Sequence, residues 1–137
     1  MNAITKTAII TGGGSGIGRA AAIALSDAYN LVLVGRRIET LQATAEEMSS
    51  TISSTLLVPA DLSNPDAIGE VFRQTQDQFG RLDVLFNNAG VSVGGAAWEN
   101  TVDDWEWVMG VNLYGVVWGV KTFTPMMIAQ LVMLRPR

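Results

Sequence analysis

Three side chains near the end of the chain are of the types that could reduce a carbonyl group: Asn112, Tyr114 and Lys121. A tyrosine that is assisted by a neighbouring lysine can pass a proton to or from a reacting oxygen. On a helix, however, Tyr114 and Lys121 would share a face but lie two turns, about 10 Å, apart. The spacing therefore predicts that Tyr114 serves packing or an interface and does not transfer protons.

A cluster of glycines near the start of the chain suits a different task, the binding of phosphate. The stretch TGGGSGIGR at 11–19 lies between a β-branched run, TAIIT at 7–11, and an apolar helical face that begins at Ile17. Glycines let the backbone approach a phosphate, and a helix start directs free N–H groups and a partial positive charge at it. In this context we expect a phosphate-binding turn and not merely a flexible one.

The spacing of these glycines argues against three common motifs. GxGxxG fails because Ile17 stands where the third glycine is needed. The P-loop pattern has Arg19 and Ala20 in place of the lysine and hydroxyl that hold phosphate and Mg²⁺, which disfavours an ATPase. The hydrolase pattern GxSxG fails because Ile17, and not a glycine, lies two residues after Ser15.

The elements that would position these residues alternate along the chain. Apolar runs predict four strands, at 7–11, 31–35, 55–60 and 82–88. Between them the apolar periodicity predicts helices, the first of which would end near Asn30 as a left-handed cap, and the third of which would run from Pro65 to Phe79. TVDD at 101–104 is typical of a capping box that opens a long apolar helix. This order predicts an α/β fold with a parallel sheet.

Composition narrows the class of protein. The 137 residues suffice for about one domain. A net charge of −4 without a basic face argues against nucleic acid as a partner. Histidine and cysteine do not occur, so we expect no metal site. The longest apolar stretch, 110–130, contains Asn112, Lys121 and Pro125, so we interpret it as a buried helix and not a membrane span. We expect a cytoplasmic protein.

Four motifs, in order, resemble the short-chain dehydrogenase/reductase family: TGxxxGxG at 11–18, Asp61 after the third strand, NNAG at 87–90 and WxxVMxVNLxG at 105–115. The resemblance implies a Rossmann-like, doubly wound parallel sheet with strand order 3-2-1-4, here truncated after the fifth helix. It implies that residues 1–130 form a partial NAD(P)-binding domain. Residues 131–137 would be a carboxyl-terminal tail outside the family pattern.

The resemblance also implies where the cofactor binds. The pyrophosphate would contact the glycine turn at Gly12, Ser15, Gly16, Ile17 and Gly18. Adenine would meet Asp61 and the Leu62 backbone, although the Asp61 carboxylate could instead cap the following helix. The segment Asn88, Ala89 and Gly90 would line the cofactor's ribose, and Asn87 would tie strand backbones together.

The choice of cofactor depends on the end of the second strand. NAD enzymes usually have a carboxylate there for the ribose 2′-hydroxyl, but this chain has Gly35, followed by Arg36 and Arg37. Gly35 leaves room, and a guanidinium can bind a 2′-phosphate through two hydrogen bonds. The alternative is a pair of solvated arginines at a helix start, where positive charge is slightly unfavourable. We expect NADP in preference to NAD.

Of the family's catalytic groups, only the asparagine has a counterpart here, Asn112. The sequence contains no YxxxK, because Leu33 follows Tyr29 at that spacing and Trp118 follows Tyr114. The resemblance thus implies an NADP-dependent oxidoreductase that transfers hydride between NADP(H) and an alcohol or ketone. We expect the chain to be inactive alone.

Two alternatives stay open, a non-catalytic nucleotide-binding or dimerisation module and, less favoured, an ATPase. The expected partners are a small-molecule substrate of the full-length family protein and a second copy of the chain. Self-association would use the long fifth helix and the free edge of strand four. The apolar patch would be formed by Trp118, Phe123, Met126 and Met127.

Overall fold

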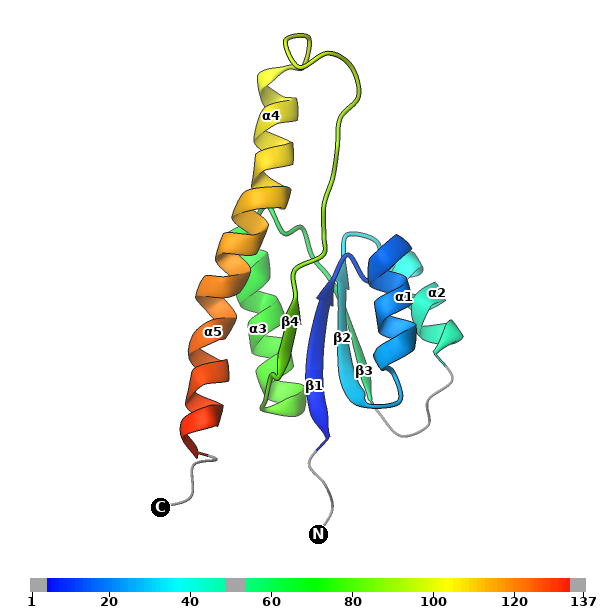
Figure 1. Ribbon diagram of the computed structural model, residues 1–137, viewed down its shortest axis with the longest axis vertical. Coiled ribbons are helices and arrows are strands. Elements are labelled where there is room, and N and C mark those ends of the chain that lie inside the picture. The colour runs from blue at the N-terminus through cyan, green and yellow to red at the C-terminus, as the bar shows by residue number, and fades with distance from the viewer. Residues whose placement is uncertain (1–4, 49–53, 134–137) are drawn as a thin grey trace.

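The computed structural model describes residues 5–48 and 54–133 (Figure 1). Strands and helices alternate in the order β1 (Lys6–Thr11), α1 (Gly16–Leu25), β2 (Tyr29–Gly35), α2 (Ile38–Glu47), β3 (Thr55–Pro59), α3 (Pro65–Phe79) and β4 (Val84–Phe86). One continuous helical segment follows, formed by α4 (Val102–Met109), the π-helical turn η1 (Gly110–Tyr114) and α5 (Gly115–Met133). The predicted alternation is confirmed.

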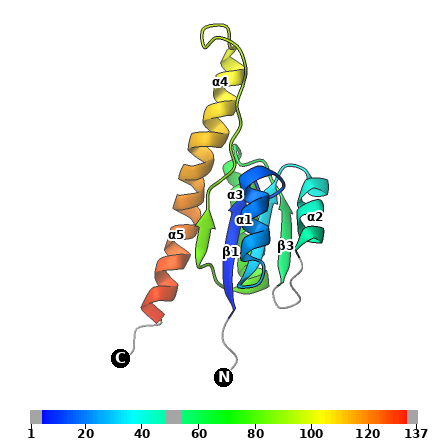
Figure 2. The same ribbon diagram turned by 45° about the vertical axis from the view of Figure 1, so that its right-hand side comes forward.

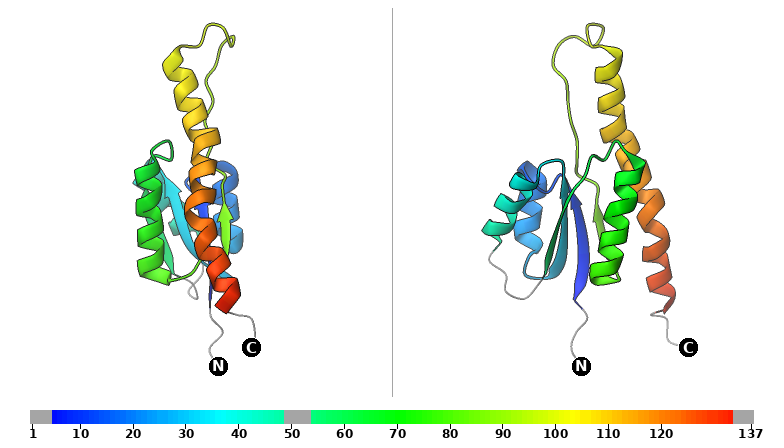
Figure 3. Two further views of the ribbon diagram at one scale, coloured as in Figure 1. Left: turned by 90° about the vertical axis from the view of Figure 1, so that its left-hand side faces the viewer. Right: turned by 180° about the vertical axis from the view of Figure 1, so that it is seen from behind.

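The four strands form one parallel sheet in the order β3-β2-β1-β4, which confirms the predicted topology. Helices α1 and α2 cover one face of the sheet, and α3 and α5 cover the other (Figures 2 and 3). Strand order changes direction between β1 and β4, and ligands of open α/β sheets bind beyond the carboxyl ends of the strands at such a point. Helix α4 and the loop before it project past those ends (Figure 1).

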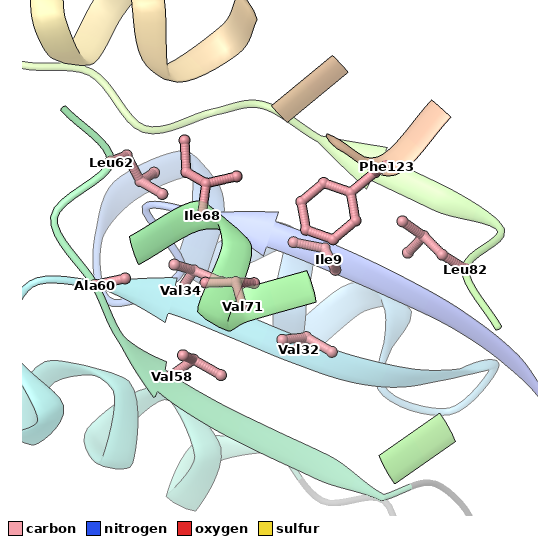
Figure 4. Close-up of a cluster of buried hydrophobic side chains, with 10 residues drawn as sticks. All are labelled: Ile9, Val32, Val34, Val58, Ala60, Leu62, Ile68, Val71, Leu82 and Phe123. Atoms are coloured by element: carbon pink, nitrogen blue, oxygen red, sulfur yellow. The ribbon is translucent and has the colours of Figure 1, made fainter. Parts of the chain in front are cut away.

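Two apolar clusters, one on each face, hold the sheet between its helices. The cluster on the α3 and α5 side consists of Ile9, Val32, Val34, Val58, Ala60, Leu62, Ile68, Val71, Leu82 and Phe123 (Figure 4). The cluster on the other side consists of Ala8, Ile10, Ala22, Leu31, Leu33 and Leu41. Successive residues of β1 and β2 therefore enter opposite clusters, as the pleat of a strand requires.

Two predicted boundaries were wrong. Asn30 is not a helix cap, because α1 already ends at Leu25 and Asn30 lies in β2, paired with Thr7 of β1. Its side-chain Oδ1 accepts a hydrogen bond from the Ser54 N–H at 3.0 Å, which links the starts of β2 and β3. The fourth strand covers only Val84–Phe86 and not 82–88, because it pairs with β1 alone and the chain leaves the sheet after Phe86.

The helix starts follow the local sequence signals. Asn64 caps α3 by accepting the Asp66 N–H at 2.9 Å, and Pro65 occupies the first turn. Thr101 and Asp104 form the predicted capping box of α4, each side chain accepting the other residue's backbone N–H. Helix α3 ends at Gly80, whose φ of 64° is the left-handed conformation that favours glycine.

Glycines let the long helical segment lie close to the carboxyl edge of the sheet. An added Cβ would lie 3.0 Å from Ser63 Cβ at Gly110, 3.2 Å from Leu62 O at Gly115 and 2.8 Å from Asn87 Oδ1 at Gly119. One turn beyond Gly119, the Phe123 ring enters the core and lies 5.8 Å from the Phe72 ring, measured between centroids. This close approach positions η1 against the residues that follow β4.

The expectation of a buried apolar helix is wrong for this chain, because much of the segment is exposed. The exposed apolar residues of η1 and α5 are Leu113, Tyr114, Val117, Val120, Ile128, Leu131, Val132 and Met133. By length and composition, the helix Val102–Met133 could cross a membrane, with a mean hydropathy of 1.3 and 11% of its apolar window buried. The same composition suits a helix inside a larger soluble protein.

Candidate functional site

A cavity of about 120 Å³ opens at the carboxyl ends of the strands and brings together residues from distant parts of the sequence. Six of its lining residues are predicted site residues: Gly12, Arg36, Asp61, Leu62, Ala89 and Gly90. Four others were not predicted to belong to the site: Gly35, Ala60, Val91 and Val111. Seven predicted residues do not line it: Ser15, Gly16, Ile17, Gly18, Arg37, Asn88 and Asn112. The start of the glycine turn, at Gly12, thus lines the cavity, whereas the residues from Ser15 to Gly18 lie outside it.

The glycine turn has the backbone geometry that its sequence predicts. Gly12 and Gly16 have φ values of +67° and +51°, which residues with a Cβ rarely adopt. Gly18 lies so close to the turn that an added Cβ would be 2.2 Å from the Gly12 carbonyl oxygen. The Gly13 N–H donates to the Val34 carbonyl at 3.1 Å and anchors the turn to β2. Helix α1 therefore begins directly behind the turn.

The first residues of α1 face outward beside this turn. Ser15 is the N-cap residue, and its exposed side chain makes no capping hydrogen bond. The side chain of Ile17 is 73% exposed, although it is apolar. The first N–H groups of a helix have no partner within the helix, so this end of α1 presents donors and a partial positive charge. Such a surface can hold an anion next to the cavity.

Asp61 does not cap the helix that follows it. Its Oδ1 accepts hydrogen bonds from the Ser63 N–H at 3.0 Å and the Ser63 hydroxyl at 2.8 Å, while Asn64 is the cap of α3. The capping alternative is therefore wrong. The exposed Asp61 carboxylate lies at the cavity mouth, and the buried Leu62 side chain lines its wall.

The segment after β4 is fixed by the hydroxyl of Thr11. This hydroxyl donates to the Phe86 carbonyl at 3.3 Å and accepts the Asn88 and Ala89 N–H groups at 2.9 and 3.0 Å. The Asn88 side-chain amide donates to the Thr11 carbonyl at 3.1 Å. Asn88, and not Asn87 as predicted, therefore ties the ends of β1 and β4 together. These bonds leave Ala89 and Gly90 facing the cavity.

The two arginines after β2 are placed differently. Arg36 lines the cavity, whereas Arg37 is the N-cap residue of α2 and lies outside it. The Arg36 guanidinium carbon is 5.5 Å from the centroid of the Trp107 ring in α4. The sequence suggested that Gly35 leaves room for the 2′-phosphate. An added Cβ at Gly35 would lie 3.2 Å from Leu41 Cδ2, so helix α2 limits that room.

Arg36 has no acidic partner among the described residues, unlike three of the other described arginines. Three of those arginines are ion-paired, Arg19 with Glu47, Arg73 with Glu70 and Asp77, and Arg81 with Asp83. Among the described residues no carboxylate pairs with Arg36. Its N–H donors are thus available to an anion in the cavity.

Asn112 lies in the π-helical turn and forms hydrogen bonds with the loop after β4. Its Oδ1 accepts the Val91 N–H and its Nδ2 donates to the Val91 carbonyl, both at 2.8 Å. A π-helical turn often marks a functional site, because it redirects side chains locally. Asn112 also lines a second cavity. The other lining residues come from α4, namely Asp104, Trp105 and Val108, and from the loop after β4. The amide is therefore engaged in positioning backbone.

Tyr114 and Lys121 lie away from both cavities. The Tyr114 ring is 48% exposed and stacks on Trp118, with centroids 6.1 Å apart. Lys121 Nζ lies 5.6 Å from the centroid of the same Trp118 ring. Both side chains thus contact the partly buried Trp118 ring, while Tyr114 and Lys121 themselves are exposed. This arrangement agrees with a packing or interface role for Tyr114, although on the surface and not in the core.

Besides the four cavity residues that were not predicted, the roles of Thr11 and Trp107 were not expected from the sequence. Thr11 was assigned to a motif, but its role as the junction between β1 and the segment after β4 was not expected. Trp107 was not expected near the site. The expected helix places Trp107 one turn before Val111, which could have suggested that it lies near the site. Its contact with Arg36 could not have been predicted in this way, because the two residues are far apart in the sequence.

Comparison with known proteins agrees with this geometry. A family model described as short chain dehydrogenase matches residues 6–132. An uncharacterized oxidoreductase of Staphylococcus aureus strain MW2 is 36% identical over 126 residues, which are 91% of this chain and 54% of that protein. The CLA biosynthesis dehydrogenase/reductase of Lactiplantibacillus plantarum is 33% identical, covering 91% of this chain and 44% of that protein.

Solved structures share the fold. A short chain dehydrogenase/reductase from Burkholderia phymatum in complex with NAD has a TM-score of 0.86 and 39% identity, covering 91% of this chain and 45% of that one. A metagenomic short-chain oxidoreductase in complex with NADP has a TM-score of 0.86 and 34% identity, covering 92% of this chain and 58% of that one. This chain thus spans about half the length of the relatives it matches.

Proposed function

Because this chain belongs to the short-chain dehydrogenase family, we propose that its cavity binds the adenosine end of a nicotinamide dinucleotide, and NADP in preference to NAD. The observation that carries the proposal is the meeting of residues that follow all four strands. Each strand contributes at least one lining residue: Gly12 after β1, Arg36 after β2, Asp61 after β3 and Ala89 after β4.

The residues of the cavity fit such a ligand. The turn at Gly12, and the start of α1 beside it, offer backbone donors to a pyrophosphate. Asp61 and the Leu62 backbone would contact adenine, and Ala89 and Gly90 would follow the ribose, held in place by Asn88. At about 120 Å³ the cavity is smaller than the 300–1,000 Å³ typical of a complete small-molecule site, which supports binding of one part of the dinucleotide.

Arg36 supports the preference for NADP. It lines the cavity, has no carboxylate partner among the described residues and directly follows Gly35, where no acidic side chain is available to a 2′-hydroxyl. A guanidinium can hold a 2′-phosphate with two charge-assisted hydrogen bonds. Arg37 lies outside the cavity, so we expect the preference for NADP to depend on Arg36.

We expect Arg36→Asp to remove or reverse the preference for NADP⁺ over NAD⁺. The two ligands differ only in the 2′-phosphate, so the ratio of their dissociation constants isolates that group. Losing hydrogen bonds to a charged group should reduce the preference roughly 10- to 100-fold, whereas NAD⁺ affinity should stay equal or improve. Isothermal titration calorimetry of the 137-residue chain measures both constants.

Arg37→Asp is the matched control, because it makes the same charge change one residue away and outside the cavity. Its ratio should stay close to that of the unsubstituted chain. An equal loss of preference in both variants would mean that overall charge, and not a contact of Arg36, sets the preference. An unchanged ratio in Arg36→Asp would refute the assignment.

For the whole protein we propose hydride transfer between NADP(H) and an alcohol or ketone of small-molecule size. The nicotinamide ring, when bound, supplies or accepts the hydride. We propose that residues 1–137 do not perform this reaction alone, because Tyr114 and Lys121 lie on the outer surface of the helix and the Asn112 amide is bonded to Val91. The same observations support the alternative of a non-catalytic nucleotide-binding module.

We also propose that the chain self-associates through the predicted long helix and the edge of β4, but with other residues of that helix than those predicted. Phe123 is buried, and Trp118, Met126 and Met127 are partly buried against the core, so they form no exposed patch. The outer face of the helix, with Val117 42% and Val120 48% exposed, is the apolar surface available to a second copy.

Sedimentation velocity tests this association. The unsubstituted chain should sediment as a dimer or larger species, and Val117→Lys combined with Val120→Lys should shift it toward the monomer, because burying two charges in an apolar contact is costly. Gln78→Lys, at an exposed position of α3, should leave the distribution unchanged. A monomer at high concentration without substitutions would contradict the proposal.

A further inference from the structure

Trp107 is a partly buried aromatic residue whose role the cofactor-binding motifs do not account for. It lies in the middle of α4, and the Arg36 guanidinium lies over its ring, 5.5 Å from the ring centroid. Arg36 lines the cavity on its β2 side, so this contact links helix α4 to a cavity residue.

The local structure fixes where the Trp107 ring lies. The capping box of Thr101 and Asp104 sets the start of α4. Val111 comes four residues after Trp107, and residues at this spacing share a helix face. Val111 lines the same cavity as Arg36. Trp107 does not itself line the cavity, but it contacts Arg36, which does, and it lies four residues before Val111.

The chemistry of the contact leaves Arg36 able to bind an anion. A cation over an aromatic ring is attracted by the negative face of the ring, and this attraction uses none of the N–H donors. A carboxylate would occupy those donors, as carboxylates do for Arg19, Arg73 and Arg81. Trp107 thus restricts the long arginine side chain without satisfying it, so less side-chain freedom is lost when a ligand binds.

We propose that Trp107 is a positioning residue for NADP selectivity, which holds the Arg36 guanidinium at the cavity with its donors free for the 2′-phosphate. This inference rests on the proposed function, because it assumes that Arg36 meets that phosphate. Trp107 acts through Arg36, so its effect should fall on NADP⁺ and not on NAD⁺.

The test is a double-mutant cycle on the 137-residue chain, with dissociation constants for NADP⁺ and NAD⁺ measured by calorimetry. Trp107→Leu should reduce the preference for NADP⁺ about 2- to 5-fold, the range expected for an exposed cation–π contact. Trp107→Phe keeps an aromatic face and should retain most of the preference. Trp105→Leu makes the same change on the same helix, where no described arginine lies over the ring, and should leave the ratio unchanged.

The decisive comparison combines Trp107→Leu with Arg36→Ala. In that background the substitution at Trp107 should no longer change the ratio, whereas a persistent effect would overturn the inference, since Trp107 would not act through Arg36. If the unsubstituted chain prefers NADP⁺ and Trp107→Leu keeps that preference, the inference is overturned but the proposed function is not. No preference in the unsubstituted chain would overturn both. The ratio comes from one protein preparation, so a smaller folded fraction affects both constants alike.

Discussion

Gly18→Ala should destabilise the chain by about 2 to 3 kcal/mol and weaken NADP⁺ binding, although alanine is the better helix former. An added Cβ would lie 2.2 Å from the Gly12 carbonyl oxygen and 2.8 Å from the Gly12 carbonyl carbon. Both are backbone atoms, so α1 must move away from the turn, at a cost typical of overpacking. Because Gly12 lines the cavity, that movement should also disturb the site.

Gly69→Ala is the matched control, since Gly69 also lies within a helix and an added Cβ there meets nothing within 4 Å. That variant should be stabilised by roughly 0.5 to 1 kcal/mol, because glycine is a poor helix former. Urea unfolding measures both changes. If the two variants gained similar stability, the close approach of α1 to the glycine turn would be refuted.

The second large effect concerns turnover. We expect the 137-residue chain to oxidise NADPH no faster in the presence of ketones or aldehydes than in their absence. A positioned proton donor commonly contributes about 10²- to 10⁴-fold, and precise positioning of the reactants contributes several kcal/mol more. Tyr114 and Lys121 both contact Trp118 and line neither cavity, so neither supplies that donor at the cofactor residues.

The assay follows the absorbance of reduced nicotinamide across a panel of carbonyl compounds, with a full-length short-chain dehydrogenase as the positive control. Tyr114→Phe removes the phenol hydroxyl and should match the unsubstituted chain. Turnover that is present in the unsubstituted chain and lost in Tyr114→Phe would contradict both the inactivity and the surface role of Tyr114. Turnover that persists in Tyr114→Phe would contradict the inactivity alone.

Much of the fold could be predicted because its signals are local. The β-branched run before Gly12 and the pattern around Pro65 and Gly80 depend on residues within a few positions of one another. Thr101 and Asp104 likewise cap α4 as their spacing predicted. Asn30 was misread because asparagine suits both a left-handed cap and a strand end, and only pairing with Thr7 decides between them.

The candidate site could be predicted only in part. The motifs identified Gly12 and Asp61, the end of the second strand identified Arg36, and the structure places all three at one cavity. The sequence could not decide which asparagine of the pair at 87–88 joins the strands. That choice depends on which side chain turns toward Thr11 when the chain leaves β4, and this is a long-range contact.

By itself the sequence determined the order of strands and helices, the starts of α3 and α4 and the glycine turn, because hydrogen bonding and backbone sterics act over a few residues. Only the tertiary structure decided that Phe123 is buried while Val117 and Val120 are exposed. When a helix is apolar on all sides, its sequence pattern does not show which face packs against the core. The tertiary structure also decided that Arg36 meets Trp107 and no carboxylate among the described residues. Such contacts arise when the strand ends and α4 converge in space, and their sequence separation leaves no periodic signal.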